Sequence, residues 1–196
     1  TSAVKAILVD TSGTILATSD RAVELITPEP GRFEIDPEQY FEGIVSILEE
    51  AADRGASAGT IRAVSFCAAS GNTILLDDHY QPIRNVISWL DERARNDEAV
   101  PEGLDRQGVV RTVGWGWNGG FPMAHLAWLQ KHEPERWERA RFCAMNNDYL
   151  YYRLTGRLVV DPSKATTFYL QNQKSRTWHR EYLDMLGLSE SNLPNI

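Results

Sequence analysis

The sequence predicts a mixed α/β domain with a helical second half. Three observations lead to this fold class: a β-hairpin pattern near the start of the chain, a strongly capped amphipathic helix after it, and several helix-start signals in the second half. Strands that come early and give way to helices indicate a mixed sheet with flanking helices. The 196 residues are enough to bury a sizeable core, in one large domain or two small ones.

The composition narrows the class of protein. Hydrophobic residues make up 42% and charged residues 24%, which is ordinary for a soluble globular protein. The net charge of −7, without a basic block, argues against nucleic acid as the main partner, although a local phosphate site stays open. We find no run long enough to span a membrane and no signal peptide, so a membrane is not an expected partner either.

Cysteines and histidines give no sign of a metal site. Cys67 and Cys143 each lie inside an apolar run, which is typical of buried free thiols in a cytosolic protein, although a single disulfide stays open. The four histidines have no spacing typical of metal ligands. We therefore expect no metal-binding residues and a cytoplasmic location.

The first elements are a hairpin and a helix. Residues 4–9 form an apolar run, 10–13 a turn, and 14–19 the return strand, so the two strands should pair antiparallel in one sheet. A short strand is expected at 33–35. Asp36 is an N-cap candidate, Pro37 suits the first helical position, and Gly55 ends the apolar stripe. A helix over 36–54 should therefore pack on a face of the hairpin.

A group of strands leads to the first candidate site. Apolar runs predict strands at 61–68, 73–76 and 85–88. Trp89, Asp91 and Arg93 follow the last of them, and Asn72 lies between the first two. An indole wall beside a carboxylate and a guanidinium suits a polyhydroxylated ligand. The alternative is a strand-capping tryptophan with a surface Asp-Arg pair, and the local sequence alone favours that alternative.

The second half is mostly helical. After a polar helical segment beyond Arg93, residues 111–121 combine four glycines with two tryptophans, which predicts a loop. Its tryptophans either form ligand-facing walls or fill a gap, and the sequence does not separate the two. Pro122 and Pro134 begin helices, 141–145 is a short strand, and two later helices end at Gly156 and Gly187.

Taken together, these pieces resemble the N-terminal domain of the FGGY carbohydrate kinases, a family that includes xylulokinase, gluconokinase and glycerol kinase. The matches keep the family's order through nearly the whole chain. They comprise residues 1–6 (the end of the phosphate loop and the next strand), 30–37 (Pro-Gly-Arg-Phe-Glu-Ile-Asp-Pro), 89–93 (Trp-Leu-Asp-Glu-Arg), 121–128, 147–150 (Asn-Asp-Tyr-Leu) and 154–156 (Leu-Thr-Gly).

The resemblance implies an actin-like, ribonuclease-H-like ATPase fold and phosphoryl transfer from ATP and Mg²⁺ to a sugar hydroxyl. Sugar and ATP would be the small-molecule partners, and a homodimer is compatible with it. Thr1, Ser2 and Lys5 would meet the phosphates, whereas Asn72, Trp89, Asp91 and Arg93 would line the sugar site. The family places its catalytic base beyond Ile196, so no catalytic residue is expected in this chain.

Departures from the family pattern refine these expectations. The Asp and Gly of the phosphate loop, the segment with the base and the ATP-binding domain are not in the sequence. We therefore expect residues 1–196 to be a sugar-binding domain, truncated at both ends and inactive alone. Ser70-Gly71 stands where glycerol kinase has Arg-Glu and xylulokinase has Met-His, and Gly120 stands where glycerol kinase has Tyr, so a glycerol kinase is not expected. The expected substrate is a ketopentose or related sugar. The alternative is a non-catalytic member that binds sugar or nucleotide.

Overall fold

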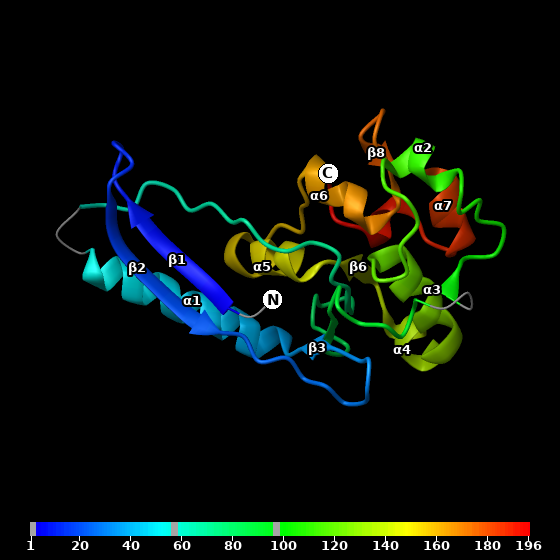
Figure 1. Cartoon of the computed structure of the whole chain (residues 1–196), viewed down its shortest axis with the longest axis horizontal. Helices are drawn as coiled ribbons and strands as arrows, with labels where there is room; N and C mark the ends of the chain where they lie inside the picture. Colours follow the sequence, from blue (N-terminus) through cyan, green and yellow to red (C-terminus); the bar gives the residue numbers. More distant parts are fainter. Residues whose placement is uncertain (1–2, 56–58, 96–98) are drawn as a thin grey trace. The chain divides into compact units, whose positions relative to one another are not determined.

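The computed structural model describes residues 3–55, 59–95 and 99–196, in two compact units (Figure 1). The first unit comprises Thr1–Ile26 and Ile35–Ala69, and the second comprises Thr27–Glu34 and Ser70–Ile196. The short strand β3 (Glu34–Ile35) lies where the chain passes from the second unit into the first. Its position agrees with the strand predicted at 33–35.

The first unit is built on a β-hairpin. Strands β1 (Ala3–Val9) and β2 (Ile15–Ala22) pair antiparallel, with Ala6 opposite Ser19 and Ile7 opposite Thr18. One carboxylate oxygen of Asp10 accepts hydrogen bonds from the backbone N–H groups of Ser12 and Thr14, at 2.8 and 2.9 Å, and so fixes the turn. The predicted antiparallel pairing is confirmed.

Helix α1 (Pro37–Arg54) packs on one face of this hairpin. The side chain of Asp36 caps it by accepting hydrogen bonds from the backbone N–H groups of Glu38 and Gln39, at 2.9 and 3.0 Å. Ile47 and Ala51 on the helix pack against Ala6 on β1, and all three are buried. The predicted helix and its position on the sheet are confirmed.

The strand predicted at 61–68 is wrong. The structure has no strand over residues 59–70, and Ile61 and Val64 are 47% and 56% exposed. A strand needs a pairing partner, and within the described residues β1 pairs with β2 alone.

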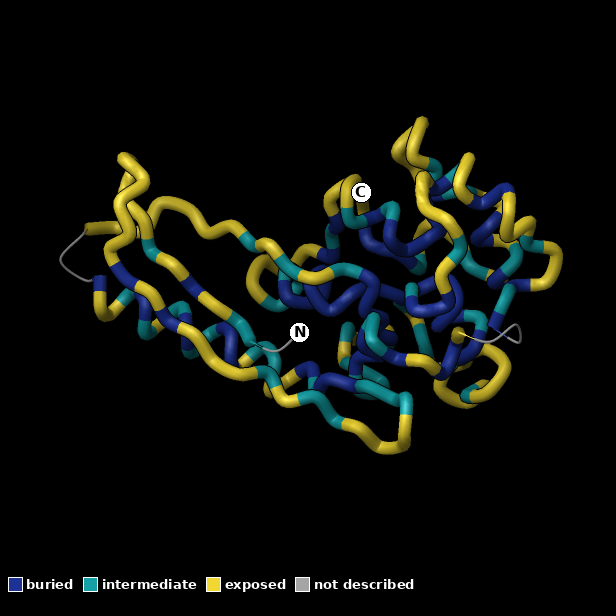
Figure 2. The backbone as a smooth tube through the Cα atoms, in the orientation of Figure 1, coloured by how far each residue is buried: buried dark blue, intermediate teal, exposed yellow. Residues whose placement is uncertain are grey.

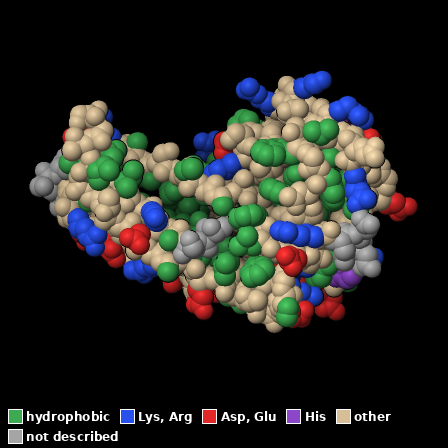
Figure 3. All heavy atoms as spheres, in the orientation of Figure 1, with side chains coloured by type: hydrophobic (Ala, Val, Ile, Leu, Met, Phe, Trp, Pro, Cys, Tyr) green, Lys and Arg blue, Asp and Glu red, His purple; other side chains and the backbone are tan. Residues whose placement is uncertain are grey.

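Cys67 lies in this unpaired segment and is exposed, so its predicted burial is wrong; both cysteines are free thiols. Hydrophobic side chains of the visible surface are drawn in Figure 3.

The second unit holds the larger core. Strands β4 (Ile74–Leu76) and β6 (Phe142–Ala144) pair antiparallel, with Leu75 opposite Cys143, and are almost fully buried. Strand β5 (Val86–Ile87) is buried too. Figure 2 colours the buried parts of the backbone dark blue. Helix α3 (Pro122–His132) supplies fully buried apolar side chains to the same core, among them Leu126.

Further short elements surround this core: α2 (Val109–Val113), α4 (Pro134–Arg139), α5 (Asn146–Thr155), α6 (Pro162–Ala165), β7 (Gln171–Asn172), β8 (Thr177–Trp178) and α7 (Arg180–Met185), with 3₁₀ turns at Thr166–Phe168 and Glu190–Asn192. The helix starts at Pro122 and Pro134 are confirmed. Gly156 and Gly187 have positive φ and end their helices as predicted.

One expectation for this unit needs correction, and another falls partly outside the residues that the structure describes. The loop predicted over 111–121 begins only after α2, which occupies its first three residues. The polar helical segment after Arg93 starts as a turn and continues into residues 96–98, outside the described residues. Among the helices that the structure describes, no helix combines the length and apolar character needed to cross a membrane.

Candidate functional site

The four residues predicted for a sugar site all belong to the second unit, and three of them lie in the turn 88–93 after β5. Ser88, which is fully buried, begins this turn: its carbonyl accepts from the backbone N–H of Asp91 at 2.9 Å. The hydroxyl oxygen of Ser88 also accepts from the backbone N–H of Leu90, at 3.2 Å. The turn is therefore held at its first residue by two hydrogen bonds.

Asn72 holds the turn from a second direction. Its side-chain oxygen accepts a hydrogen bond from the backbone N–H of Trp89 at 2.9 Å, and its amide donates to the side-chain oxygen of Asn146 at 3.0 Å. Asn72 and Asn146 are both buried, 3% and 4% exposed. Asn72 thus lies next to Trp89, as predicted, but both ends of its amide are already paired within the protein.

The side chain of Trp89 is half-buried, and glycines lie close to this residue. A Cβ atom on Gly71 would lie 2.7 Å from the ring of Phe121 and 3.2 Å from the Cβ of Trp89. A Cβ atom on Gly120 would lie 3.1 Å from the carbonyl oxygen of Trp89. Within the described residues, the buried indole Nε1 of Trp89 has no hydrogen-bond partner. A side chain at position 71 would therefore clash with Phe121, and one at position 120 would crowd the carbonyl of Trp89.

Asp91 and Arg93 form a closed pair in the interior. One carboxylate oxygen of Asp91 accepts from the backbone N–H and Nε of Arg93, at 2.9 and 2.8 Å. The other accepts from Nη2 of Arg93 at 2.9 Å and from the backbone N–H of Phe33 at 2.7 Å. Asp91 is 0% exposed and each oxygen accepts two hydrogen bonds, so its acceptor positions are filled. The predicted surface Asp-Arg pair is wrong, because the pair is buried.

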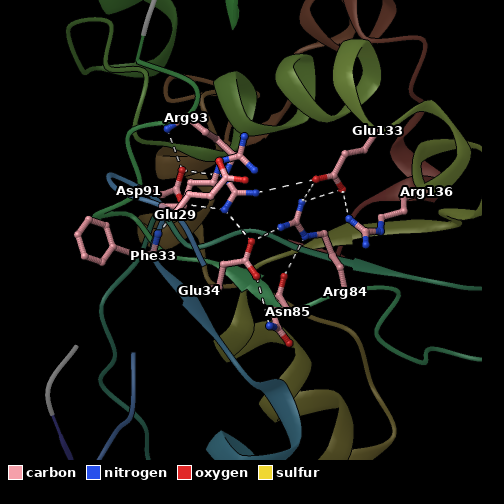
Figure 4. Close-up of polar contacts among 10 residues, drawn as sticks. Glu29, Phe33, Glu34, Arg84, Asn85, Asp91, Arg93, Glu133 and Arg136 are labelled. Atoms are coloured by element: carbon pink, nitrogen blue, oxygen red, sulfur yellow. Dashed lines mark hydrogen bonds and ion pairs between the residues drawn. The ribbon is translucent and has the colours of Figure 1, made fainter. Parts of the chain in front are cut away.

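This pair belongs to a larger cluster of buried charges (Figure 4). Nη2 of Arg93 also donates to Glu34 at 2.7 Å, and Glu34 in turn pairs with Arg84. Nη1 of Arg84 donates to both carboxylate oxygens of Glu133 at 2.8 Å. We call these five residues the buried ion network; all have side chains that are at most 14% exposed.

Three members of this network were not predicted from the sequence: Glu34, Arg84 and Glu133. They are about fifty residues apart along the chain, so no local spacing connects them. Glu34 occurs in one of the motifs that carry the family resemblance, but that motif contains no sign of its partners. Only the packing of β3, β5 and the end of α3 brings the three side chains together.

The network sets the protonation of its members by two opposing effects. Burial raises the pKa of Asp91, but the hydrogen bonds from Arg93 and Phe33 outweigh it and leave that pKa below its usual value. For Arg93, burial lowers the pKa, and its bonds to Asp91 and Glu34 more than compensate and raise it. Both residues are therefore charged at neutral pH.

In the glycine-rich loop after α2, the two tryptophans have different surroundings, which bears on whether they face a ligand or fill a gap. Trp117 packs edge-on against Tyr169, with ring centroids 6.0 Å apart, and the hydroxyl of Tyr169 donates to the carbonyl of Gly116 at 2.7 Å. Trp117 therefore fills a gap. Trp115 is 53% exposed, and its Nε1 donates to the hydroxyl of Thr166 at 3.2 Å.

The residues predicted to meet phosphates lie in the first unit. Thr1 and Ser2 fall outside the described residues. Lys5 is exposed on β1, on the face of the strand opposite the buried Ala6.

A pocket of about 280 Å³ in the same unit is lined by residues that include Arg21, Asp36 and Tyr40, and by none of the predicted site residues. Among described residues, no group of three or more His, Cys, Asp or Glu side chains could hold a metal ion.

Comparison with known protein families gives a match over the whole chain. Residues 1–196 match the model of the N-terminal domain of the FGGY family of carbohydrate kinases. A xylulose kinase from Staphylococcus xylosus is 27% identical over 100% of this chain and 41% of its own length. The chain therefore spans about two fifths of the length of the curated relatives that it matches.

Solved structures give the same picture at the level of the fold. A ligand-bound xylulose kinase from Lactobacillus acidophilus matches with a TM-score of 0.91 and 28% identity, over 100% of this chain and 40% of that one. A gluconate kinase from the same organism matches with a TM-score of 0.91 and 27% identity, over 100% of this chain and 39% of that one.

Proposed function

The chain belongs to the FGGY family of carbohydrate kinases and has their actin-like ATPase fold, and on this premise we propose that it is the N-terminal, sugar-binding part of a longer kinase. This kinase transfers a phosphoryl group from ATP to a hydroxyl of a ketopentose or related sugar. The observation that carries the proposal is the match of the whole chain to the family, with relatives named xylulose kinase.

In this proposal Trp89 is the residue of the turn 88–93 that faces the sugar. Its ring offers a flat apolar wall to the C–H face of a sugar. Asn72 holds the backbone of Trp89, whereas Asp91 and Arg93, whose hydrogen bonds are satisfied internally, hold the turn in place. Gly71 and Gly120 pack closely beside Trp89 and contribute no side chain to the proposed site.

The nucleotide side of the proposal rests on fewer residues. Lys5 is accessible on β1 and carries the positive charge that a phosphate group requires, and Thr1 and Ser2 would add hydroxyl groups. Mg²⁺ would arrive with ATP, because this ion is usually held by substrate phosphates together with one or two carboxylates. This chemistry consists mostly of positioning and charge stabilisation, and the base that accepts the hydroxyl proton would come from beyond Ile196.

The experiment is an ADP-release assay on the longer protein that contains this chain, with D-xylulose, D-ribulose, gluconate and glycerol as acceptors. We expect a catalytic efficiency with a ketopentose at least about tenfold above that with glycerol. The chain on its own, as the control, should release no ADP. Sugar binding without ADP release in the longer protein would support a non-catalytic binding member instead, and neither binding nor turnover would overturn the proposal.

Two further expectations accompany this function. The kinase would act in the cytoplasm, where ATP is available, and it would be compatible with a homodimer. Light scattering coupled to size-exclusion chromatography of the longer protein measures the second directly.

A further inference from the structure

We propose that Glu34, Arg84 and Glu133 are positioning residues for the sugar site, acting through the buried ion network on the turn that carries Trp89. This inference rests on the proposed function, because it assigns these residues to sugar binding. None of the three would touch the sugar. Each would instead fix the place of the turn 88–93, through Arg93 and its partner Asp91.

A path of contacts joins the three distant residues to the turn. Glu133 follows α3 and receives Nη1 of Arg84 at 2.8 Å. Arg84 also pairs with Glu34, which accepts from Nη2 of Arg93 at 2.7 Å. Arg93 closes the path by binding Asp91, two residues after Trp89. Every link is a charge-assisted hydrogen bond between side chains that Figure 4 shows converging from separate segments.

The turn 88–93 is also attached to the segment before β3 and to helix α3. The carboxylate of Asp91 accepts from the backbone N–H of Phe33, and the backbone N–H of Glu92 donates to the carbonyl of Gly31 at 2.8 Å. The guanidinium carbon of Arg93 also lies 5.3 Å from the ring centroid of Trp128 on α3. The turn is thereby fixed between the segment before β3 and helix α3.

The negative and positive charges in and next to the network are equal in number. Three carboxylates, those of Glu34, Asp91 and Glu133, face three guanidinium groups, those of Arg84, Arg93 and Arg136. Removing one charge leaves its partner buried and uncompensated, and the remaining side chains must rearrange to pair it.

The network constrains the position of the turn more than it stabilises the fold. Buried ion pairs contribute little net stability relative to apolar packing, because desolvation offsets most of their attraction. They do constrain geometry, since planar guanidinium groups require their acceptors at fixed places. A turn whose Trp89 must meet a ligand benefits from this constraint, and Asn72 supplies the same kind of constraint from the other direction.

The test uses the longer protein with Glu34→Gln, which keeps the shape of the side chain and one acceptor oxygen but removes the charge. We expect the sugar KM to rise about tenfold, near the lower limit for a lost charged hydrogen bond. The KM for ATP and the kcat should stay within about twofold of the parent values, because positioning of the sugar alone is affected. Glu50→Gln, on a partly exposed ion pair of the first unit, is the matched control and should change none of these quantities.

The outcomes separate this inference from a merely structural role and from failure of the proposed function. A structural role alone would lower the melting temperature and the folded fraction, and thus the apparent kcat, without changing the sugar KM. That result, or equal rises of both KM values, would overturn the inference. If Glu34→Gln does not fold, Glu133→Gln replaces it, because Glu133 binds Arg84 and also lies 4.0 Å from Nη1 of Arg93. The expected rise in sugar KM is about threefold. A KM equal to that of the parent would then overturn the inference. Trp89→Ala, measured in parallel, reports on the proposed sugar site itself: normal sugar binding there would reject that site regardless of Glu34.

Discussion

The carboxylate of Asp91 accepts three hydrogen bonds from Arg93, one from its backbone N–H and two from its guanidinium group, at 2.8 to 2.9 Å. With the fourth bond, from Phe33, this buried carboxylate is fully satisfied inside the protein. An Asp-x-Arg spacing in a turn thus forms an interior ion pair, and in the proposed function the neighbouring Trp89 is the residue that meets the sugar.

If the proposed function holds, Asp91→Asn in the longer protein should reduce the catalytic efficiency by about ten- to a hundredfold, mainly through the sugar Michaelis constant. The change removes charged hydrogen bonds worth roughly 1.5–3 kcal/mol each, at about 1.4 kcal/mol per decade, and loosens the turn that presents Trp89. It should also lower the free energy of unfolding by about 3–5 kcal/mol, because part of the charge on Arg93 loses its partner.

Steady-state kinetics and urea unfolding of Asp91→Asn distinguish the possible roles. Unchanged kinetics would remove Asp91 from the site. A fall of several decades in kcat, with the sugar KM preserved, would instead identify Asp91 as the catalytic base. The family resemblance places that base beyond Ile196, so we expect neither result.

Trp89→Ala should weaken sugar binding more than ATP binding. The indole is half-buried, and Asn72 holds the backbone N–H of Trp89 just after a strand, in the position expected for a wall of the sugar site. Calorimetric titration of both ligands measures this, on protein shown to be folded, because loss of a packed indole can cost about 3–5 kcal/mol of stability. Trp115→Ala, at a 53% exposed tryptophan, is the control and should leave both affinities intact. Equal losses for sugar and ATP in Trp89→Ala would argue against this assignment.

The stability of the chain should fall as the pH rises from 6.5 to 8. Burial raises the pKa of Asp148 from 3.8 to about 8, so between these values the folded state binds more protons than the unfolded state. Burial also lowers the pKa of His125 from 6.5 to about 3, which has the opposite effect, but only below pH 6.5. Above that pH the effect of Asp148 remains, at no more than about 1.4 kcal/mol per pH unit.

Urea unfolding across this pH window checks the expectation for Asp148. In the parent chain the free energy of unfolding should decrease toward pH 8, and in Asp148→Asn this decrease should be absent. The asparagine keeps an oxygen that can accept from the backbone N–H of Met145, as Asp148 does at 2.9 Å, so the start of α5 stays capped. The same slope in both proteins would show that Asp148 does not titrate in this range.

The two cysteines should differ sharply in reactivity. Cys67 is exposed, whereas Cys143 is 2% exposed and burial raises the pKa of its thiol to about 12. A colorimetric thiol reagent should therefore modify one thiol quickly in the native chain and both in denaturant. In Cys67→Ser the rapid reaction should disappear. Fast modification of both thiols in the native parent would contradict the burial of Cys143.

Local signals in the sequence predicted the elements whose causes are local. Asp36 followed by Pro37 defines the start of α1, and positive-φ glycines end α5 and α7, because caps and turns depend on neighbouring residues. The segment 61–68 shows the limit of the apolar pattern. Its residues suit a strand, but a strand requires a partner, and the sequence of the segment does not contain one.

The candidate site was predictable only in part for a similar reason. Trp89, Asp91 and Arg93 are close in sequence, so their grouping was visible from their spacing and from the family motif. Their burial was not, because it depends on Glu34, Arg84 and Glu133, which approach through tertiary packing. The sequence therefore suggested a surface pair where the structure has an interior network.

The central claim is that this chain supplies the sugar site of a kinase that phosphorylates a ketopentose with ATP. The most direct measurement is phosphorus NMR of the longer protein incubated with ATP, Mg²⁺ and D-xylulose. We predict a new phosphomonoester signal that grows as the signal of the ATP γ-phosphate declines, and that is absent without the sugar. Loss of the γ-phosphate to inorganic phosphate alone, at the same rate with and without sugar, would contradict the account.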